Sequence, residues 1–99
     1  AERLALMKEN AVLINVGRGI TVDTDALVQA LQEKRIAGAC LDVTDPEPLP
    51  ADHPLWNMEN VILTPHMGWK GLETRQRLVA LLAGNIRSYL EGRPIHVVS

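Results

Sequence analysis

The sequence predicts an α/β fold built on a parallel sheet. Two apolar runs of strand length, residues 11–16 and 36–43, are separated by a helical pattern over residues 25–35. A third apolar run, residues 60–66, follows a proline-rich connection. Strand, helix, strand, connection and strand is the alternation typical of parallel strands in one sheet. Because the runs are continuous rather than alternating, they favour strands that are buried on both faces.

The first half of the chain carries signals for helix boundaries and loops. A short helix is expected at the N-terminus, with Glu2 near its positive end, and Asn10 can close it. The two glycines of residues 17–19 predict a loop directly after the first strand. Asp23 or Thr24 can then cap the helix that leads to the second strand.

The second half of the chain contains one long connection and one long helix. Residues 44–54, TDPEPLPADHP, are rich in proline and acidic side chains, so they are expected to form a loop. Residues 72–92 place leucine and isoleucine at helical spacing, which predicts a long helix with one packing face. Residues 92–99 are compatible with a short final strand.

Composition limits the classes of protein to consider. The 99 residues, 46% of them hydrophobic, fit one small globular domain or part of a larger one. The chain begins inside a helical pattern without an initiator methionine and is lean in aromatic residues, so we expect it to be a fragment. A net charge of −2 without a basic run argues against nucleic-acid binding, and no apolar stretch is long enough for a membrane span. A single cysteine, Cys40, favours a reducing, cytoplasmic compartment.

Four ionisable side chains follow the carboxyl ends of the three predicted strands. Arg18 follows the first strand, Asp42 ends the second with Glu47 in the loop beyond it, and His66 ends the third. Ligands of open parallel sheets bind outside the carboxyl ends of the strands, at one common edge. We therefore expect these four side chains to converge on one site.

Together, these residue types suit a small substrate with a carboxylate and a carbonyl or hydroxyl group. The guanidinium of Arg18 can hold a carboxylate through two hydrogen bonds and polarise the neighbouring carbonyl. The imidazole of His66 can exchange the hydroxyl proton, and Glu47 can stabilise and orient the imidazolium. None of the three accepts hydride, so reduction of a carbonyl would require a cofactor.

Each residue taken alone has a simpler interpretation. Arg18 and Glu47 could be solvated loop charges, and Asp42 could cap a turn. His66 could be a buried histidine that is satisfied by a backbone carbonyl, which is the commoner fate of a lone histidine. We assign His53 and His96 to such structural roles.

Other kinds of site are disfavoured by spacing. The histidines lack the spacing of metal ligands and Cys40 falls inside a predicted strand, so no metal site is expected. Nothing near Cys40 in sequence would activate it as a nucleophile. The glycines of NVGRG have neither the dinucleotide-binding nor the Walker spacing, so they do not predict a phosphate-binding loop.

Three stretches, LINVGRGITVDTDALVQAL, AGACLDVTDPEPLP and NVILTPHMGW, strongly resemble consecutive signatures of the D-isomer-specific 2-hydroxyacid dehydrogenase family. They occur in order and with family-like spacing over nearly the whole chain. The resemblance implies an oxidoreductase that uses NAD or NADP to interconvert a 2-keto acid and a D-2-hydroxy acid. It also implies that Arg18 binds substrate, that His66 is the acid/base, and that Glu47 pairs with His66.

The resemblance further assigns the nicotinamide end of a cofactor to this chain. Asp42 is expected to contact the carboxamide, residues 16–18 to line the ribose, and Gly68 to contact the nicotinamide. The full set of implied cofactor-binding residues is Val16, Gly17, Arg18, Asp42, His66 and Gly68.

The glycine-rich turn G-x-G-x-x-G and the acidic residue that binds the adenosine ribose are missing from this chain. The chain therefore resembles the C-terminal third of a family member. Residues 1–71 are expected to be the second half of a Rossmann-like NAD(P)-binding domain, and residues 72–99 a long C-terminal helix and tail that return to the substrate domain. A tryptophan at the position of Trp69 resembles the pattern of the glycerate and hydroxypyruvate reductases of this family. Lys70 and Gly71 depart from the common family pattern.

Two functions follow from the resemblance. The first is a dehydrogenase or reductase for a small acid such as glyoxylate or hydroxypyruvate, homodimeric at full length. As a fragment it is expected to be inactive and to self-associate. The alternative is an NAD(H)-sensing, corepressor-like binding module of the same fold. A purely structural α/β domain would require all three motifs to be coincidental.

Overall fold

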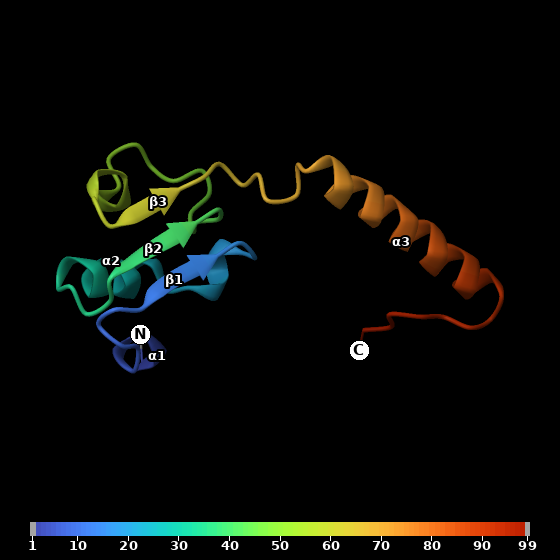
Figure 1. The fold of residues 1–99 in the computed structure, drawn as a ribbon, viewed down its shortest axis with the longest axis horizontal. Coiled ribbons are helices and arrows are strands. Elements are labelled where there is room, and N and C mark those ends of the chain that lie inside the picture. The colour runs from blue at the N-terminus through green and yellow to red at the C-terminus, as the bar shows by residue number, and fades with distance from the viewer. Residues whose placement is uncertain (1, 99) are drawn as a thin grey trace. The chain divides into compact units, whose positions relative to one another are not determined.

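A three-stranded parallel sheet forms the centre of the first compact part of the chain. In the computed structural model, which describes residues 2–98, the strands are β1 (Val12–Asn15), β2 (Gly38–Leu41) and β3 (Val61–Leu63), in the order β1-β2-β3 (Figure 1). Both neighbouring pairs are parallel. The predicted α/β architecture with three parallel strands is therefore confirmed, with strands shorter than the apolar runs.

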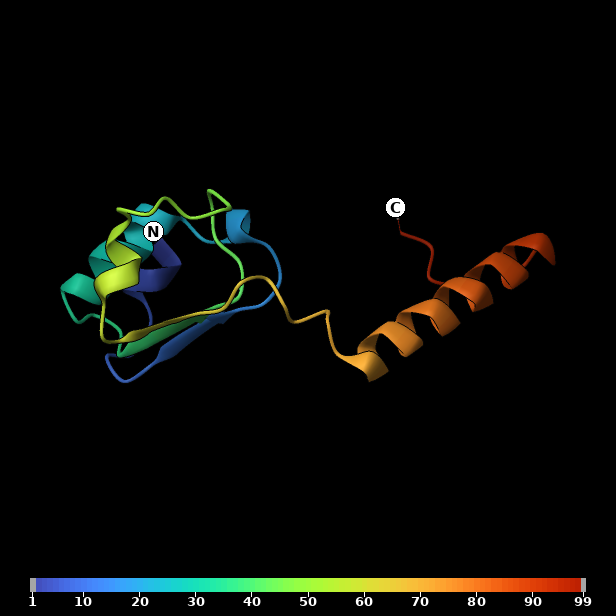
Figure 2. The same ribbon diagram turned by 90° about the horizontal axis from the view of Figure 1, so that it is seen from above.

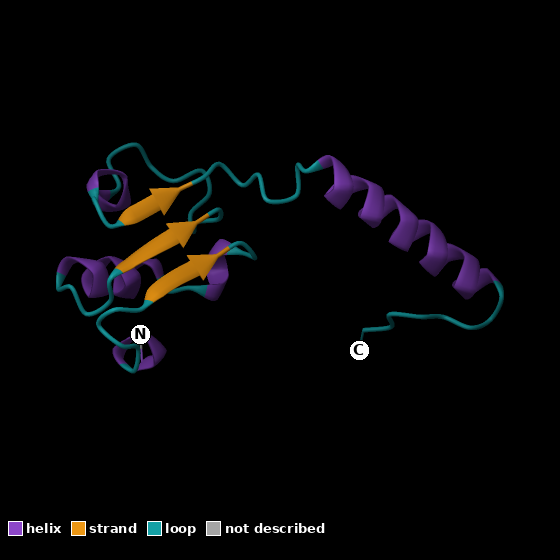
Figure 3. Ribbon diagram, in the orientation of Figure 1, coloured by secondary structure: helices purple, strands orange, loops and turns teal. Residues whose placement is uncertain are grey.

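Short helices lie before the first strand and between successive strands (Figure 3). These helices are α1 (Glu2–Ala5), the 3₁₀ helix η1 (Gly19–Thr21), α2 (Thr24–Gln32) and the 3₁₀ helix η2 (Pro54–Asn57). Of the two predicted cap candidates, Asp23 is the one that caps α2, because its Oδ1 accepts the N–H of Ala26 at 3.0 Å. The expectation that Asn10 closes α1 is wrong. The helix ends at Ala5, where Leu6 and Met7 donate to the third residue back.

The hydrophobic core lies between one face of the sheet and the helices. Figure 2 shows the helices of residues 2–67 on the same side of the three strands. The largest side chains that are almost fully buried are Leu27, Leu31, Ile36 and Leu55. The sheet contributes Leu13, Ala39 and Val61, which are aligned across the three strands. Burying each leucine stabilises the fold by roughly 1.5–3 kcal/mol.

Within residues 2–67 no helix covers the opposite face of the sheet (Figure 2), so the predicted burial of the strands on both faces is not found in this unit. Ile14, Cys40 and Ile62 are aligned across this face, and the two isoleucines are 69% and 62% exposed. The cause is topological. Successive crossovers run in one direction across the sheet, and right-handed crossovers then place all their helices on one face.

The chain from Gly68 onward forms a second compact unit. The contacts divide the chain after Met67, a little before the expected division at residue 71. The predicted long helix is α3 (Leu72–Leu90), and no described helix is long and apolar enough to cross a membrane. The helix ends at Leu90, and the φ of 73° at Gly92 permits the N–H groups of Gly92 and Arg93 to donate back to carbonyls of its last turn.

The final strand expected over residues 92–99 is not found in the described residues 92–98. A strand requires a neighbouring strand to complete its hydrogen bonds. The N–H groups of Gly92 and Arg93 instead donate to Tyr89 and Ser88, which turns the chain at the helix end.

The packing of Gly19 generates a stability prediction. Gly19 is buried, and a Cβ added there would lie 1.9 Å from the backbone oxygen of Thr44. Gly19→Ala should therefore force the two loops apart and lower the free energy of unfolding by about 1–3 kcal/mol. Urea denaturation, followed by the fluorescence of Trp56, measures this change.

Gly17→Ala is the matched control in the same loop, because its Cβ would meet only Oδ1 of Asn15 at an ordinary 3.7 Å. Equal denaturation midpoints for the two variants would contradict the close packing of the two loops.

Candidate active site

The predicted catalytic residues lie beyond the carboxyl ends of the three strands. Arg18 follows β1, Glu47 follows β2 and His66 follows β3, all in the loops that leave one edge of the sheet. Parallel strands bring their carboxyl ends to the same edge, which explains why residues far apart in sequence meet there.

Glu47 and His66 are in direct contact. Nδ1 of the imidazole lies 2.5 Å from Oε1 of the carboxylate, although 19 positions separate the two residues. Their side chains are 38% and 40% exposed, for His66 and Glu47 respectively. An ion pair with this much exposure stabilises a fold by at most about 1 kcal/mol. The contact therefore matters mainly because it orients the imidazole ring.

A tight turn presents His66 at the end of β3. Its φ is 51°, in the left-handed region that costs an L-residue other than Gly or Asn roughly 1 kcal/mol or more. Its N–H donates to the carbonyl of Thr64 at 3.0 Å. Such a conformation persists only where neighbouring groups hold it. Asp42 accepts two of the hydrogen bonds that do so.

Asp42 is buried at the end of β2 and holds both sides of this turn. Its Oδ1 accepts the hydroxyl of Thr64 at 2.5 Å and the backbone N–H of Met67 at 2.9 Å. Its own N–H donates to the carbonyl of Asn15 at 2.9 Å, which joins it to β1. Only 7% of Asp42 is exposed, so these donors satisfy a carboxylate that burial would otherwise make costly.

Asn15 organises the loop that carries Arg18. Its Oδ1 accepts the N–H of Gly17 at 3.1 Å, and its Nδ2 donates to the carbonyl of Arg18 at 2.9 Å. The exposed guanidinium of Arg18 donates to the carbonyl of Gly17 at 2.8 Å. The structure thus joins Glu47 to His66 but forms no contact between Arg18 and either of them.

The remaining predicted cofactor residues occupy different environments. Val16 is 70% exposed and Gly17 is also at the surface, whereas Asp42 is buried. Gly68 begins the second unit of the chain. Within residues 2–98 no group of three or more acidic, histidine or cysteine side chains could hold a metal ion.

A cavity of about 460 Å³ lies beside the His66–Glu47 pair. Its wall is mainly apolar and includes Leu49, Trp56 and Leu63. The polar residues that line it are Asp42, Thr44, Glu47, Thr64 and His66. An apolar hollow with a few polar groups is typical of small-molecule sites. The carboxylate of Asp42 lines this cavity and the backbone of Gly17 is exposed, and both are chemically compatible with the amide and ribose of a nicotinamide.

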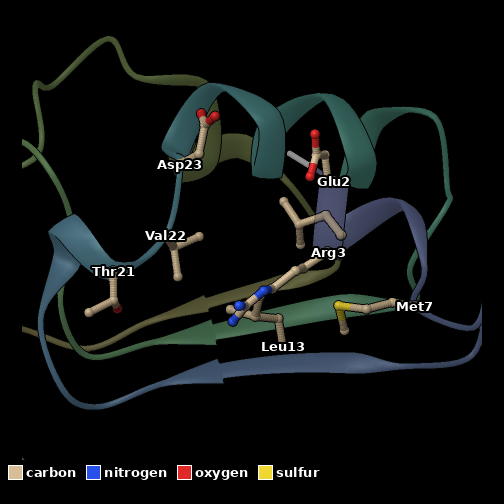
Figure 4. A pocket seen from close by; sticks show the side chains of 8 residues that line it. Glu2, Arg3, Met7, Leu13, Thr21, Val22 and Asp23 are labelled. Carbon is tan, nitrogen blue, oxygen red and sulfur yellow. The ribbon is translucent and has the colours of Figure 1, made fainter.

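A larger cavity, of about 650 Å³, contains none of the predicted site residues. It lies along β1, beneath α1 and the segment that enters α2, and Figure 4 shows Leu13, Val22 and Arg3 around it. We take the smaller cavity as the candidate site, because His66, Glu47 and the buried Asp42 all line it.

Sequence reasoning missed the two residues that anchor the site loops, Asn15 and Thr64. Both left a signal. Asn15 is the one polar residue in the apolar run 11–16, and Thr64 stands directly before the proline and histidine that end β3.

Comparisons with known proteins identify the family of this chain. Residues 1–68 match the model of the family described as D-isomer specific 2-hydroxyacid dehydrogenase, NAD binding domain. The glyoxylate reductase of Thermofilum pendens is 53% identical over 91 residues, covering 92% of this chain and 27% of that protein. The human glyoxylate reductase/hydroxypyruvate reductase is 47% identical over 89 residues, covering 90% of this chain and 27% of that protein.

A solved structure shows the same fold. A D-isomer specific 2-hydroxyacid dehydrogenase from Xanthobacter autotrophicus, in complex with NADPH and MES, is 42% identical and superimposes with a TM-score of 0.81. The match covers 96% of this chain and 38% of that one. The chain spans between 25% and 30% of the length of the most similar curated relatives. The chain belongs to the D-isomer-specific 2-hydroxyacid dehydrogenase family, and its first 68 residues match that family's NAD-binding domain.

Proposed function

We propose that this chain supplies the acid/base part of the active site of an NAD(P)-dependent D-2-hydroxyacid dehydrogenase. The observation that carries the proposal is the 2.5 Å contact between Nδ1 of His66 and Oε1 of Glu47 at the strand ends. Relatives named glyoxylate and hydroxypyruvate reductases support a small 2-keto acid as the substrate. Because those relatives are several times longer, the chain by itself is expected to be inactive.

The pairing of Glu47 with His66 determines which ring nitrogen does the chemistry. When Nδ1–H donates to the carboxylate, Nε2 is the nitrogen that exchanges a proton with substrate. In the direction of reduction, Nε2 gives its proton to the carbonyl oxygen, which becomes the hydroxyl. The carboxylate of Glu47 stabilises the positive charge that the ring carries before the transfer.

Arg18 is placed to bind the acid group of the substrate. Its guanidinium is exposed at the end of β1, and its loop is fixed by the side chain of Asn15. A guanidinium forms paired hydrogen bonds with a carboxylate and keeps its charge at all relevant pH values. Substrate binding would draw the side chain away from the carbonyl of Gly17 and toward His66.

The residues proposed to hold the nicotinamide end of the cofactor are Val16, Gly17, Arg18, Asp42, His66 and Gly68. A bound NADH or NADPH supplies the hydride that the carbonyl carbon accepts. Asp42 offers an acceptor for the carboxamide and fixes the turn of His66 beside it.

An NAD(H)-sensing module of the same fold was the alternative. The two relatives described above are named as reductases and the solved structure as a dehydrogenase, so no observation favours a sensor over an enzyme. We further propose that the full-length protein is a homodimer, and that it acts in the cytoplasm.

The first prediction concerns the proton carrier. In the full-length protein, His66→Ala should lower kcat for a 2-keto acid by roughly 10²–10⁴-fold, because the carbonyl oxygen loses its proton donor. Binding of NADH or NADPH, measured by fluorescence titration, should be retained. His96→Ala is the control, since His96 bonds to Asn85 in the second unit. Full turnover in His66→Ala would refute the assignment.

The second prediction separates charge from shape at Glu47. Glu47→Gln keeps an oxygen acceptor near Nδ1 but removes the negative charge, so kcat should fall while the KM for the keto acid changes little. Steady-state kinetics measure both constants, and Glu59→Gln is the control on an exposed acid elsewhere. An unchanged kcat would show that the charge of Glu47 is not used.

The third prediction concerns substrate binding by Arg18. Arg18→Lys keeps the positive charge but loses the paired hydrogen-bond geometry, so kcat/KM for the keto acid should fall strongly. Cofactor affinity should change much less. A loss confined to cofactor affinity would place Arg18 on the cofactor alone.

The fourth prediction concerns the 99-residue chain by itself. Within residues 2–67 one face of the sheet is uncovered and the outer edges of β1 and β3 are unpaired. A folded sample should therefore show a light-scattering mass above the 10.9 kDa of the monomer. Ile14→Glu, on the uncovered face, should reduce the mass, whereas Ile20→Glu on η1 should not. A folded wild-type monomer would contradict this expectation.

A further inference from the structure

Thr64 connects β3 to the turn that carries His66, and it makes three hydrogen bonds there. Its N–H donates to the carbonyl of Leu41 at 3.0 Å, which extends the β2–β3 pairing by one residue. Its carbonyl accepts the N–H of His66 at 3.0 Å. Its hydroxyl donates to Oδ1 of Asp42 at 2.5 Å. Only the last of these bonds requires a threonine or serine.

The turn needs such a bond because of the backbone conformation of His66. At a φ of 51° the residue is left-handed, and the direction of its imidazole depends on that conformation. Relaxation to an extended backbone would swing the ring away from Glu47. Bonds on both sides of His66 oppose this relaxation, one from Thr64 and one from the N–H of Met67.

Both bonds end on the same atom, Oδ1 of Asp42, and that atom is well fixed. Asp42 is buried, and its N–H is bonded to Asn15 on the neighbouring strand. A buried carboxylate also holds its donors strongly, because losing one leaves charge poorly solvated. The hydroxyl of Thr64 and the N–H of Met67 therefore tie the turn to the sheet rather than to solvent.

We propose that Thr64 is a positioning residue for His66: its hydroxyl, bonded to Asp42, fixes the left-handed turn that sets the imidazole against Glu47. The inference rests on the proposed role of His66 as the acid/base. Thr64 itself need not touch substrate or cofactor. Its contribution is the fixed location of Nε2, on which proton transfer depends, since a displacement of about 1 Å can lower a rate roughly 10²-fold.

The test compares three variants in the full-length protein. Thr64→Val keeps the shape and removes the hydroxyl, Thr64→Ala removes it without the β-branch, and Thr64→Ser restores it. Thr74→Val, on α3, is the matched control for the same chemical change. Steady-state kinetics give kcat and KM with a 2-keto acid, and spectra of ¹⁵N-histidine-labelled protein report the ring of His66.

We expect Thr64→Val and Thr64→Ala to lower kcat by roughly 10- to 100-fold, with the KM for the keto acid and the affinity for NADH changed by less than about threefold. The ring resonances of His66 should shift or broaden in both variants. Thr64→Ser and Thr74→Val should resemble the wild type in both measurements.

Any other result overturns the role of Thr64. The experiment also distinguishes this failure from a failure of the proposed function. A kcat within twofold of wild type for Thr64→Val and Thr64→Ala, while His66→Ala is inactive, removes the role of Thr64 but keeps that of His66. Failure of Thr64→Ser to restore kcat shows that packing, not the hydroxyl, matters. If the wild type turns over no 2-keto acid, the proposed function fails, and unchanged His66 resonances in Thr64→Ala would still refute the positioning role.

Discussion

The site depends on one buried carboxylate. Asp42 lies under the carboxyl edge of the sheet, where burial obliges it to collect hydrogen-bond donors. Those donors are a hydroxyl and an N–H from the two sides of the turn at His66. The carboxylate of Asp42, which would destabilise the fold if it were unpaired, thereby fixes the position of His66, the proposed acid/base. The same constraint explains how a half-exposed imidazole keeps a defined direction.

The first strand repeats the arrangement with a different side chain. Asn15 is also buried at a strand end, and its amide holds the loop of Arg18 from inside. Its backbone carbonyl accepts the N–H of Asp42, so the two anchors are joined across β1 and β2. The loop of Arg18, the proposed substrate-binding cation, and the turn of His66, the proposed acid/base, are thus attached to one small polar network, and His66 also contacts Glu47.

Local rules accounted for the parts of this structure that depend on local sequence. The alternation of apolar runs predicted the parallel sheet, and the position before a helical pattern narrowed its cap to Asp23 or Thr24. Strand-end residues could be selected because parallel strands share one ligand-binding edge. The left-handed backbone of His66 was not predictable, since it is held by a partner from another strand. The uncovered face was mispredicted for a related reason: apolar runs indicate that a strand should be buried, but not which segment covers it.

The central claim is that a 2-keto acid is held between Arg18 and the oriented ring of His66. A crystal structure of the full-length protein with its nicotinamide cofactor and oxamate, an unreactive analogue of a 2-keto acid, tests this directly. The account predicts the oxamate carboxylate on the guanidinium of Arg18, and its carbonyl oxygen about 2.6–3.2 Å from Nε2 of His66. Nδ1 should remain on Glu47. An analogue bound elsewhere, or a ring turned away from Glu47 in that complex, would contradict it.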